Sequence, residues 1–178
     1  MNLSNVTLKK LALIVSEKFK EYNLDCVLVG GACVTIYSQN SYQSYDLDFV
    51  TFEDMNQIEK ALSELGFQRN QRYFRHPDCP FFLEFLAPPV SIGSEAINAY
   101  YHLGALKLLT PTDCVKDRLA SYYFWDDRQA LDQAVLVAKS QKSIDLTALE
   151  RWSKKEGNQK KYCQFLERLN REASDRYR

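Results

Sequence analysis

The sequence lacks two features that mark membrane and secreted proteins. No apolar run approaches the roughly 18 residues that a membrane-spanning helix needs. The N-terminus does not have the basic-then-apolar order of a signal peptide. We therefore expect a protein without a membrane segment, located in the cytoplasm.

Cysteine and histidine are scarce and scattered. The five cysteines are widely spaced and include no Cys-x-x-Cys pair, and the two histidines, His76 and His102, are isolated. An odd number of separated cysteines disfavours both a disulfide framework and a zinc site. Cys26 and Cys33 lie in apolar stretches and are expected to be buried thiols in a reducing compartment.

The chain has no excess of either charge. It contains 23 basic and 23 acidic residues, so its formal net charge is zero and no global basic field indicates nucleic-acid binding. A local basic patch stays open. A length of 178 residues and an apolar content of 46% are typical of one globular domain, or of a core with a helical appendage.

Two short motifs follow each other near the N-terminus. An apolar run over residues 26–29 stops at Gly30-Gly31, and a helix-like segment then leads to Asp46-Leu-Asp48. Side chains alternate along a strand, so Asp46 and Asp48 would share one face and repel each other unless a cation lies between them. Mg²⁺ takes oxygen ligands of this kind, often together with substrate phosphates. The spacing predicts a metal site.

The glycine pair suggests a phosphate site beside it. Without side chains, Gly30 and Gly31 can bring backbone N–H groups close to a phosphate at a helix N-terminus. Taken alone, Gly-Gly is as often a tight turn, and a lone Asp-x-Asp is usually solvated or caps a helix. The two motifs in this order favour a joint site for a metal and a phosphate.

A third carboxylate lies further along the chain. Glu84 is the only charged residue in the apolar stretch 80–86, and its neighbours on the same strand face would be Phe82 and Leu86. Burying a lone carboxylate is costly unless it is paired or binds a metal. A half-exposed strand with Glu84 in water is the alternative. The apolar neighbours favour a functional site.

These motifs together resemble the signature of the nucleotidyltransferase superfamily. In that signature a hydrophobic residue precedes Gly-Gly or Gly-Ser, a helix follows, and the next strand carries Asp-x-Asp. A third carboxylate lies on a later strand, which Glu84 would provide here. The positions that match the first two parts are Gly30, Gly31, Asp46 and Asp48.

Further positions resemble toxin nucleotidyltransferases of the AbiEii and MenT type. Ser44 precedes Asp46 by two residues, where this branch often has Ser or Thr. Lys116 matches a lysine on the helix after the last strand, and Asp132 matches an aspartate about four turns later. Together with Arg128, Asp132 would lie near Lys116 if the two helices pack antiparallel. Such a lysine would hold the triphosphate as a point charge, whereas the alternative is an ordinary surface lysine.

The order of predicted elements indicates an α/β (α+β) fold. We expect a small mixed sheet with helices on one side in a nucleotidyltransferase-like core (residues 1–109), followed by a C-terminal helical bundle packed on it (residues 110–178). The aromatic run 122–125 could stack a base, but we favour a core role for it. Predicted strands cover 25–29, 46–51, 67–76, 80–86 and part of 101–109, and predicted helices cover 8–22, 31–38, 52–66, 113–125, 128–140, 146–156 and 160–173.

The resemblance implies a reaction. A Mg²⁺-dependent enzyme would move a nucleoside monophosphate from a nucleoside triphosphate to a hydroxyl of an RNA end, a protein side chain or a small molecule, and a toxin would have a cognate antitoxin as partner. The alternatives are a catalytically silent nucleotide-binding module on the same fold and a structural α/β protein with exposed acids. The implied ligands of two Mg²⁺ ions are Asp46, Asp48 and Glu84, and the implied nucleotide contacts are Gly30, Gly31, Ser44, Lys116 and Asp132.

Overall fold

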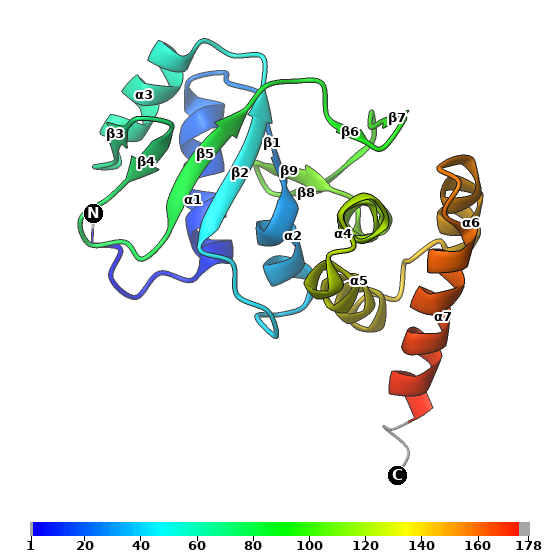
Figure 1. Cartoon of the computed structure of the whole chain (residues 1–178). Coiled ribbons are helices and arrows are strands. Elements are labelled where there is room, and N and C mark those ends of the chain that lie inside the picture. The colour runs from blue at the N-terminus through cyan, green and yellow to red at the C-terminus, as the bar shows by residue number, and fades with distance from the viewer. Residues whose placement is uncertain (1, 175–178) are drawn as a thin grey trace.

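The computed structural model describes residues 2–174; Met1 and residues 175–178, the end of the predicted C-terminal region, lie outside the described part. Helices and strands alternate as far as residue 63, strands alone follow to residue 109, and helices alone form the rest of the described part (Figure 1). In chain order the elements are α1 (Leu8–Glu21), β1 (Cys26–Val29), α2 (Gly30–Tyr37), β2 (Asp46–Thr51), α3 (Met55–Ser63), β3 (Gln68–Asn70), β4 (Tyr73–Arg75), β5 (Phe82–Leu86), β6 (Ser91–Ile92), β7 (Glu95–Ala96), β8 (Tyr100–Leu103), β9 (Leu106–Leu109), α4 (Pro111–Trp125), α5 (Arg128–Ser140), α6 (Leu146–Lys155) and α7 (Gln159–Ser174).

The main sheet is mixed and has seven strands within the described residues, in the order β3-β4-β5-β2-β1-β9-β8. Strand β2 runs antiparallel to β1 and parallel to β5, and β1 runs parallel to β9. Strands β6 and β7 form a separate two-stranded hairpin. The α/β fold with a mixed sheet and a helical C-terminal region is therefore as the sequence predicts.

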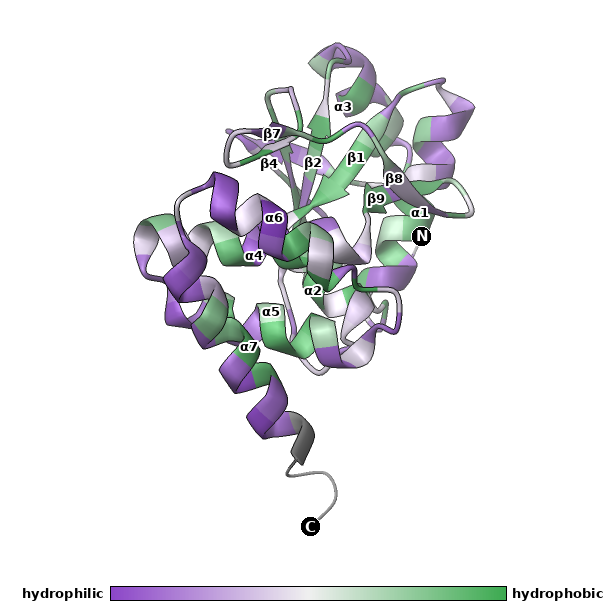
Figure 2. Ribbon diagram, turned by 90° about the vertical axis from the view of Figure 1, so that its right-hand side faces the viewer, coloured by the Kyte–Doolittle hydropathy of each residue, from purple (hydrophilic) through white to green (hydrophobic). Residues whose placement is uncertain are grey.

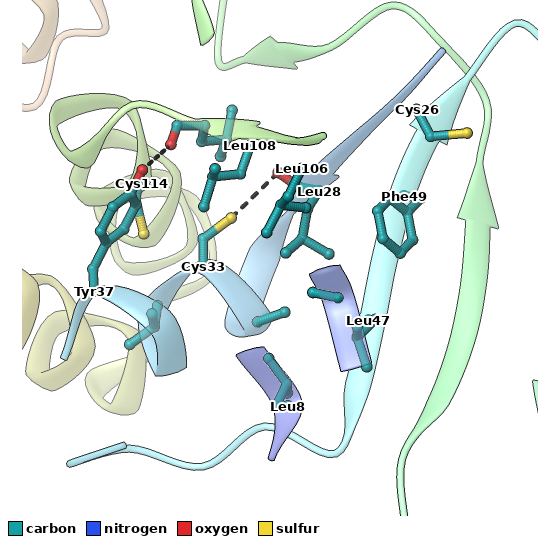
Figure 3. Packing of buried hydrophobic residues seen from close by; sticks show 14 of the residues in the cluster. Leu8, Cys26, Leu28, Cys33, Tyr37, Leu47, Phe49, Leu106, Leu108 and Cys114 are labelled. Atoms are coloured by element: carbon teal, nitrogen blue, oxygen red, sulfur yellow. Dashed lines mark hydrogen bonds between the residues drawn. The ribbon is translucent and has the colours of Figure 1, made fainter. Parts of the chain in front are cut away.

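Alternation along the strands gives the sheet two different faces. Leu28, Leu47, Phe49 and Leu83 are fully buried on the face that packs against the helices of the first half of the chain (Figure 3). The opposite face carries the acidic residues of β2 and β5. The hydrophobic core therefore lies on one side of the sheet and the polar groups on the other.

Helix α2 is fixed to the core by buried polar contacts as well as by packing. The Cys33 thiol donates to the carbonyl oxygen of Leu28 at 3.2 Å, and the Tyr37 hydroxyl donates to that of Leu109 at 2.6 Å (Figure 3). Cys26, Cys33 and Cys114 are buried free thiols, as predicted for the first two. These contacts hold α2 against the ends of β1 and β9.

The aromatic run at the end of α4 is divided between the interior and the surface. Tyr122 and Tyr123 are buried, and the Tyr123 ring stacks on Trp152 of α6 at 5.5 Å. Phe124 and Trp125 are exposed, the latter by 82%. A core role is therefore confirmed for the first two aromatics and wrong for the last two.

The sequence predictions miss several strand boundaries. The single strand predicted over 67–76 is the hairpin β3–β4, which turns at Gln71 with φ of +56°. The single strand predicted within 101–109 is the hairpin β8–β9, which turns at Gly104 with φ of +60°. The helix predicted from residue 52 starts at Met55, because the Asp54 carboxylate caps it by accepting from the backbone of the first turn.

Hydropathy follows the layering of the fold. Strand β1 is hydrophobic along its length, whereas α6 and α7 carry many hydrophilic residues (Figure 2). Over residues 2–174, no helix has both the length and the apolar character required to cross a bilayer.

Candidate functional site

The Asp-x-Asp motif lies at the start of β2, on the sheet face opposite the core. Asp46 and Asp48 are partly buried, and the intervening Leu47 points into the core with no exposed surface. The alternation of a strand therefore places both carboxylates on the same face, as predicted.

The parallel neighbour of β2 adds the third acid. In the register between β2 and β5, Asp48 lies opposite Glu84, so both side chains project from the same face. The Glu84 side chain is 17% exposed. Its Oε1 atom forms an ion pair with Nε of Arg72 at 3.4 Å. The structure thus brings Asp46, Asp48 and Glu84 together on two adjacent strands.

Like charge and burial act together at Asp48. Burial, followed by the charges of Asp46 and Glu84, raises the pKa of Asp48 to about 7, and Arg118 opposes the shift. A bound cation would relieve both the burial cost and the repulsion. A cation at this face would therefore favour the ionised form of Asp48.

The glycine pair lies directly against these acids. Helix α2 begins at Gly30, which has φ of +69°, and a Cβ atom there would come within 2.9 Å of Oδ2 of Asp48. Val29 at the N-cap makes no side-chain hydrogen bond to the first turn. The N–H groups at this helix start therefore have no cap from the preceding side chain, and the positive end of the helix dipole lies behind them.

Ser44 holds one of the acids in place. It is buried, and its hydroxyl donates to Oδ1 of Asp46 at 2.5 Å, while its backbone N–H donates to Oγ1 of Thr35 at 2.9 Å. A Cβ atom on Gly31 would come within 2.9 Å of the Ser44 hydroxyl. Ser44 thus lies between the glycine pair and Asp46, where the sequence predicts a phosphate contact, and Thr35 is a supporting residue that the sequence does not reveal.

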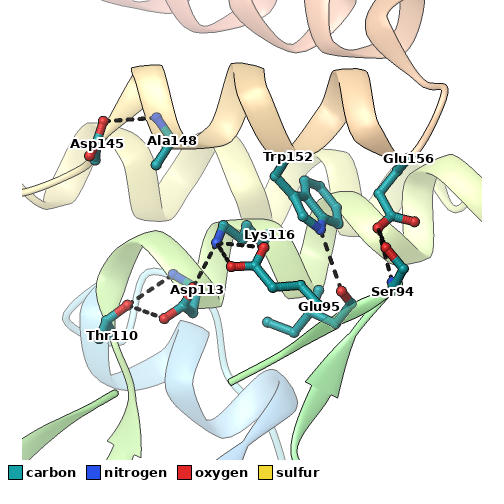
Figure 4. Close-up of polar contacts among 10 residues, drawn as sticks. Ser94, Glu95, Thr110, Asp113, Lys116, Asp145, Ala148, Trp152 and Glu156 are labelled. Atoms are coloured by element: carbon teal, nitrogen blue, oxygen red, sulfur yellow. Dashed lines mark hydrogen bonds and ion pairs between the residues drawn. The ribbon is translucent and has the colours of Figure 1, made fainter. Parts of the chain in front are cut away.

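Lys116 and Asp132 have separate partners. Lys116 is 6% exposed, and its Nζ lies 3.1 Å from Glu95 and 3.2 Å from Asp113 (Figure 4). Asp132 pairs with Arg168 of α7 at 2.7 Å. The alternative of a solvated surface lysine is wrong for Lys116, because it is buried and paired with two carboxylates.

The next residues of α4 form a second charged pair near the acids. Arg118 donates to Oδ2 of Asp117 from Nη2 at 2.5 Å and to Oε1 of Gln133 from Nη1 at 3.3 Å. Burial disfavours the charge of Arg118, but Asp117 outweighs it and raises the pKa of the guanidinium. Sequence reasoning misses both residues, because a Lys-Asp-Arg run in a helix usually indicates a solvated face.

The donor set fits a hard cation that also binds substrate. Within residues 2–174, no group of three or more His, Cys, Asp and Glu side chains is already arranged as a metal site. Mg²⁺, however, commonly uses one or two protein carboxylates and completes its shell with water and substrate phosphates. Asp46 and Asp48 supply such carboxylates next to the helix start at Gly30.

Comparison with solved structures identifies the fold of this chain. No protein-family model matches the sequence, and no curated protein matches it. Among solved structures, the chain is similar to an antigenic nucleotidyltransferase-like protein from Paracoccidioides brasiliensis, with a TM-score of 0.55 and 18% identity over 91% of this chain and 94% of that one.

A second similarity is weaker. A crystal structure of ANT(2″)-Ia in complex with adenylyl-2″-tobramycin gives a TM-score of 0.48 and 14% identity, over 74% of this chain and 89% of that one. The first comparison, together with the mixed sheet described above, establishes that this chain has the fold of nucleotidyltransferase-like proteins.

Proposed function

We propose that the protein is a Mg²⁺-dependent nucleotidyltransferase that moves a nucleoside monophosphate from a nucleoside triphosphate to an acceptor hydroxyl. The observation that carries this proposal is the juxtaposition of Asp46, Asp48 and Glu84 on one sheet face with the start of α2 at Gly30. A metal–triphosphate complex needs carboxylates to bind the metal and helix N–H groups to bind the phosphates, and here the two kinds of group are neighbours.

The residues divide the work in the following way. Asp46 and Asp48 would hold Mg²⁺, with Glu84 completing the site for a second ion. Bound Mg²⁺ supplies neutralisation of the triphosphate charge and a lowered pKa of the acceptor hydroxyl. The N–H groups of Gly30 and Gly31 would bind the β- and γ-phosphates and hold the α-phosphate in front of the acceptor.

In the transfer, the acceptor oxygen forms a bond to the α-phosphorus while the bond from that phosphorus to the bridging oxygen of the β-phosphate breaks. Pyrophosphate leaves, and the acceptor proton passes to water, or to Glu84 if this residue does not hold the second ion. Lys116 is a proposed contact for the leaving pyrophosphate. Since Lys116 is paired with Glu95 and Asp113, it would have to exchange a carboxylate for a phosphate.

The test is label transfer from each of the four nucleoside triphosphates carrying a radioactive α-phosphate. Purified protein, Mg²⁺ and cell extract are incubated together, with Asp48→Asn as the inactive control. A labelled product that disappears with the variant supports the proposal and identifies the nucleotide and the acceptor class. Nucleotide binding without transfer in any fraction would instead favour a silent binding module.

The resemblance to AbiEii and MenT toxins supports a narrower proposal, in which transfer to an RNA end or a protein arrests growth and a cognate antitoxin prevents it. Induced expression of the wild-type chain would then stop growth, and expression of Asp48→Asn would not. Normal growth with an active wild-type enzyme would remove the toxin role and leave the transferase in place, acting on a small molecule or another acceptor.

A further inference from the structure

The segment that follows β5 passes over the acidic face of the sheet and encloses a pocket beside the acids. The cavity has a volume of about 210 Å³. This is smaller than the roughly 300–1,000 Å³ of sites that enclose a whole drug-sized ligand, so it can hold one part of a larger substrate. Its lining residues are Val29, Val50, Leu86, Ala87, Pro89, Val90, Ser91, Ile92, Leu109 and Asp117.

The roof of this pocket is anchored by the C-terminal helices. Glu95 of β7 pairs with buried Lys116 of α4, and Ser94 donates to Glu156, just after α6, from its N–H at 2.9 Å (Figure 4). Trp152 of α6 donates from its indole to the carbonyl oxygen of Ile92, which is itself 3% exposed. The hairpin β6–β7 is therefore held in place from both of these helices.

The floor of the pocket continues the row of acids along the strands. Val29 lies opposite Asp48 in the register between β1 and β2, and Val50 follows Asp48 by two residues on the same face. Two residues along a strand correspond to about 7 Å. The pocket thus begins roughly one sugar ring beyond the place where Asp48 would meet the α-phosphate.

The mostly apolar lining contains two polar side chains, Ser91 and Asp117, of which only Asp117 is charged. Asp117 lines the pocket from α4, and both contacts from the neighbouring Arg118 go to its Oδ2 atom. An ionised carboxylate accepts hydrogen bonds and donates none. A ligand in this pocket is therefore favoured if it presents apolar faces to the valines and an amino group to Asp117. The single N–H group of uracil is a poorer partner, because it is flanked by two carbonyl oxygens that a carboxylate repels.

We propose that this pocket binds the nucleobase of the nucleoside triphosphate, and that Asp117 favours bases with an exocyclic amino group, namely adenine, guanine and cytosine, over uracil. The inference rests on the proposed nucleotidyltransferase function and adds a specificity site to it. We assign the base to this pocket because the pocket is continuous with the proposed phosphate site. A triphosphate at Gly30 and Gly31 with its α-phosphate at Asp48 directs the rest of the nucleotide toward Val50 and the roof.

The test measures binding by calorimetry in the presence of Mg²⁺. The probes are the α,β-methylene analogues of ATP and UTP, which are not cleaved at the α-phosphate, and inorganic tripolyphosphate, which has no base. For the wild-type protein we expect tighter binding of both analogues than of tripolyphosphate, and tighter binding of the ATP analogue than of the UTP analogue by about tenfold.

Leu86→Trp is designed to fill the pocket, because Leu86 lines it and is 39% exposed, so the change spares the core. We expect this variant to weaken binding of the ATP analogue by about tenfold and to change the affinity for tripolyphosphate by no more than roughly twofold. The matched control is Phe52→Trp: Phe52 is 86% exposed and lines a neighbouring pocket instead. It should change neither affinity.

Asp117→Asn provides a second, nearly isosteric test. The amide both donates and accepts, so the preference for the ATP analogue over the UTP analogue should fall toward equality. An unchanged preference, or equal weakening of tripolyphosphate and analogue by Leu86→Trp, would overturn the base assignment. Equal wild-type affinity for tripolyphosphate and both analogues would overturn it too while leaving the proposed function intact, and failure of all three probes to bind would overturn both.

Discussion

At Asp48, burial and like charge both favour the protonated acid. The folded protein raises the pKa of this residue from the ordinary 3.8 to about 7, so the folded state binds a proton that the unfolded state releases between those values. The stabilisation from this proton is complete below about pH 4 and is lost as the pH rises through 7. Without metal, the site therefore destabilises the protein near neutrality.

We expect Asp48→Asn to remove this pH dependence. The stability advantage of the variant over the wild type should grow by on the order of 3 kcal/mol between pH 4 and pH 8 in metal-free buffer. Urea unfolding at each pH measures it, with Asp25→Asn as control because Asp25 is an exposed partner of Lys107. Parallel curves for wild type and Asp48→Asn would contradict the assignment.

Gly30 and Gly157 form a matched pair for testing the proposed phosphate site. Both have φ of +69°, but a Cβ on Gly30 would meet Asp48 at 2.9 Å, whereas one on Gly157 would meet nothing within 4 Å. Backbone strain should cost each alanine variant about 1–2 kcal/mol. We expect only Gly30→Ala also to lose tripolyphosphate binding in Mg²⁺; equal loss in both variants would show that the clash is unimportant.

At the scale of elements, the hairpin β6–β7 is held by an ion pair between buried Lys116 and partly exposed Glu95. Glu95→Gln leaves the Lys116 ammonium with Asp113 alone, and we expect a loss of roughly 1–3 kcal/mol in unfolding free energy, since a buried charge loses part of its compensation. Hydrogen exchange should accelerate in residues 91–96 before it does in α4. Asp25→Asn, which breaks the exposed pair with Lys107, should have little effect.

How far the sequence predicts these elements depends on the length of their patterns. The acids of β2 and β5 and the glycine pair could be found, because each lies next to an apolar run that defines a strand. Strands of two residues, such as β6 and β7, have no periodicity to detect. The turn at Gln71 uses a positive φ without glycine, so the break between β3 and β4 leaves no signal.

The partners of the acids were beyond prediction for a different reason. Arg72 reaches Glu84 from the β3–β4 turn, and Arg118 lies near Asp48 only because α4 packs against α2. Such contacts are set by tertiary structure. Likewise, Lys116 is paired with Glu95 of the hairpin β6–β7, and no sequence pattern predicts this hairpin.

At the scale of the whole molecule, the helical region that we predict from residue 110 shares buried contacts with the core of residues 1–109. Cys114, Val115 and Leu119 of α4 are fully buried, and α4 packs against α2 and β9. We therefore expect residues 1–109 alone to give a poorly dispersed NMR spectrum and no cooperative unfolding. Addition of residues 110–178 as a separate chain should restore both; a cooperatively folded 1–109 fragment would contradict this.

The distribution of thiols would allow a dye to be attached at one defined position. Cys26, Cys33 and Cys114 are buried, and burial raises the pKa of the Cys26 thiol to about 12, which leaves almost no reactive thiolate at neutral pH. Cys79 is half-buried and its thiol pKa is also raised by burial. Cys163 on α7 is exposed, so a maleimide dye would attach there first. The helical region could then be followed while the proposed nucleotide ligands are added, without removing any cysteine.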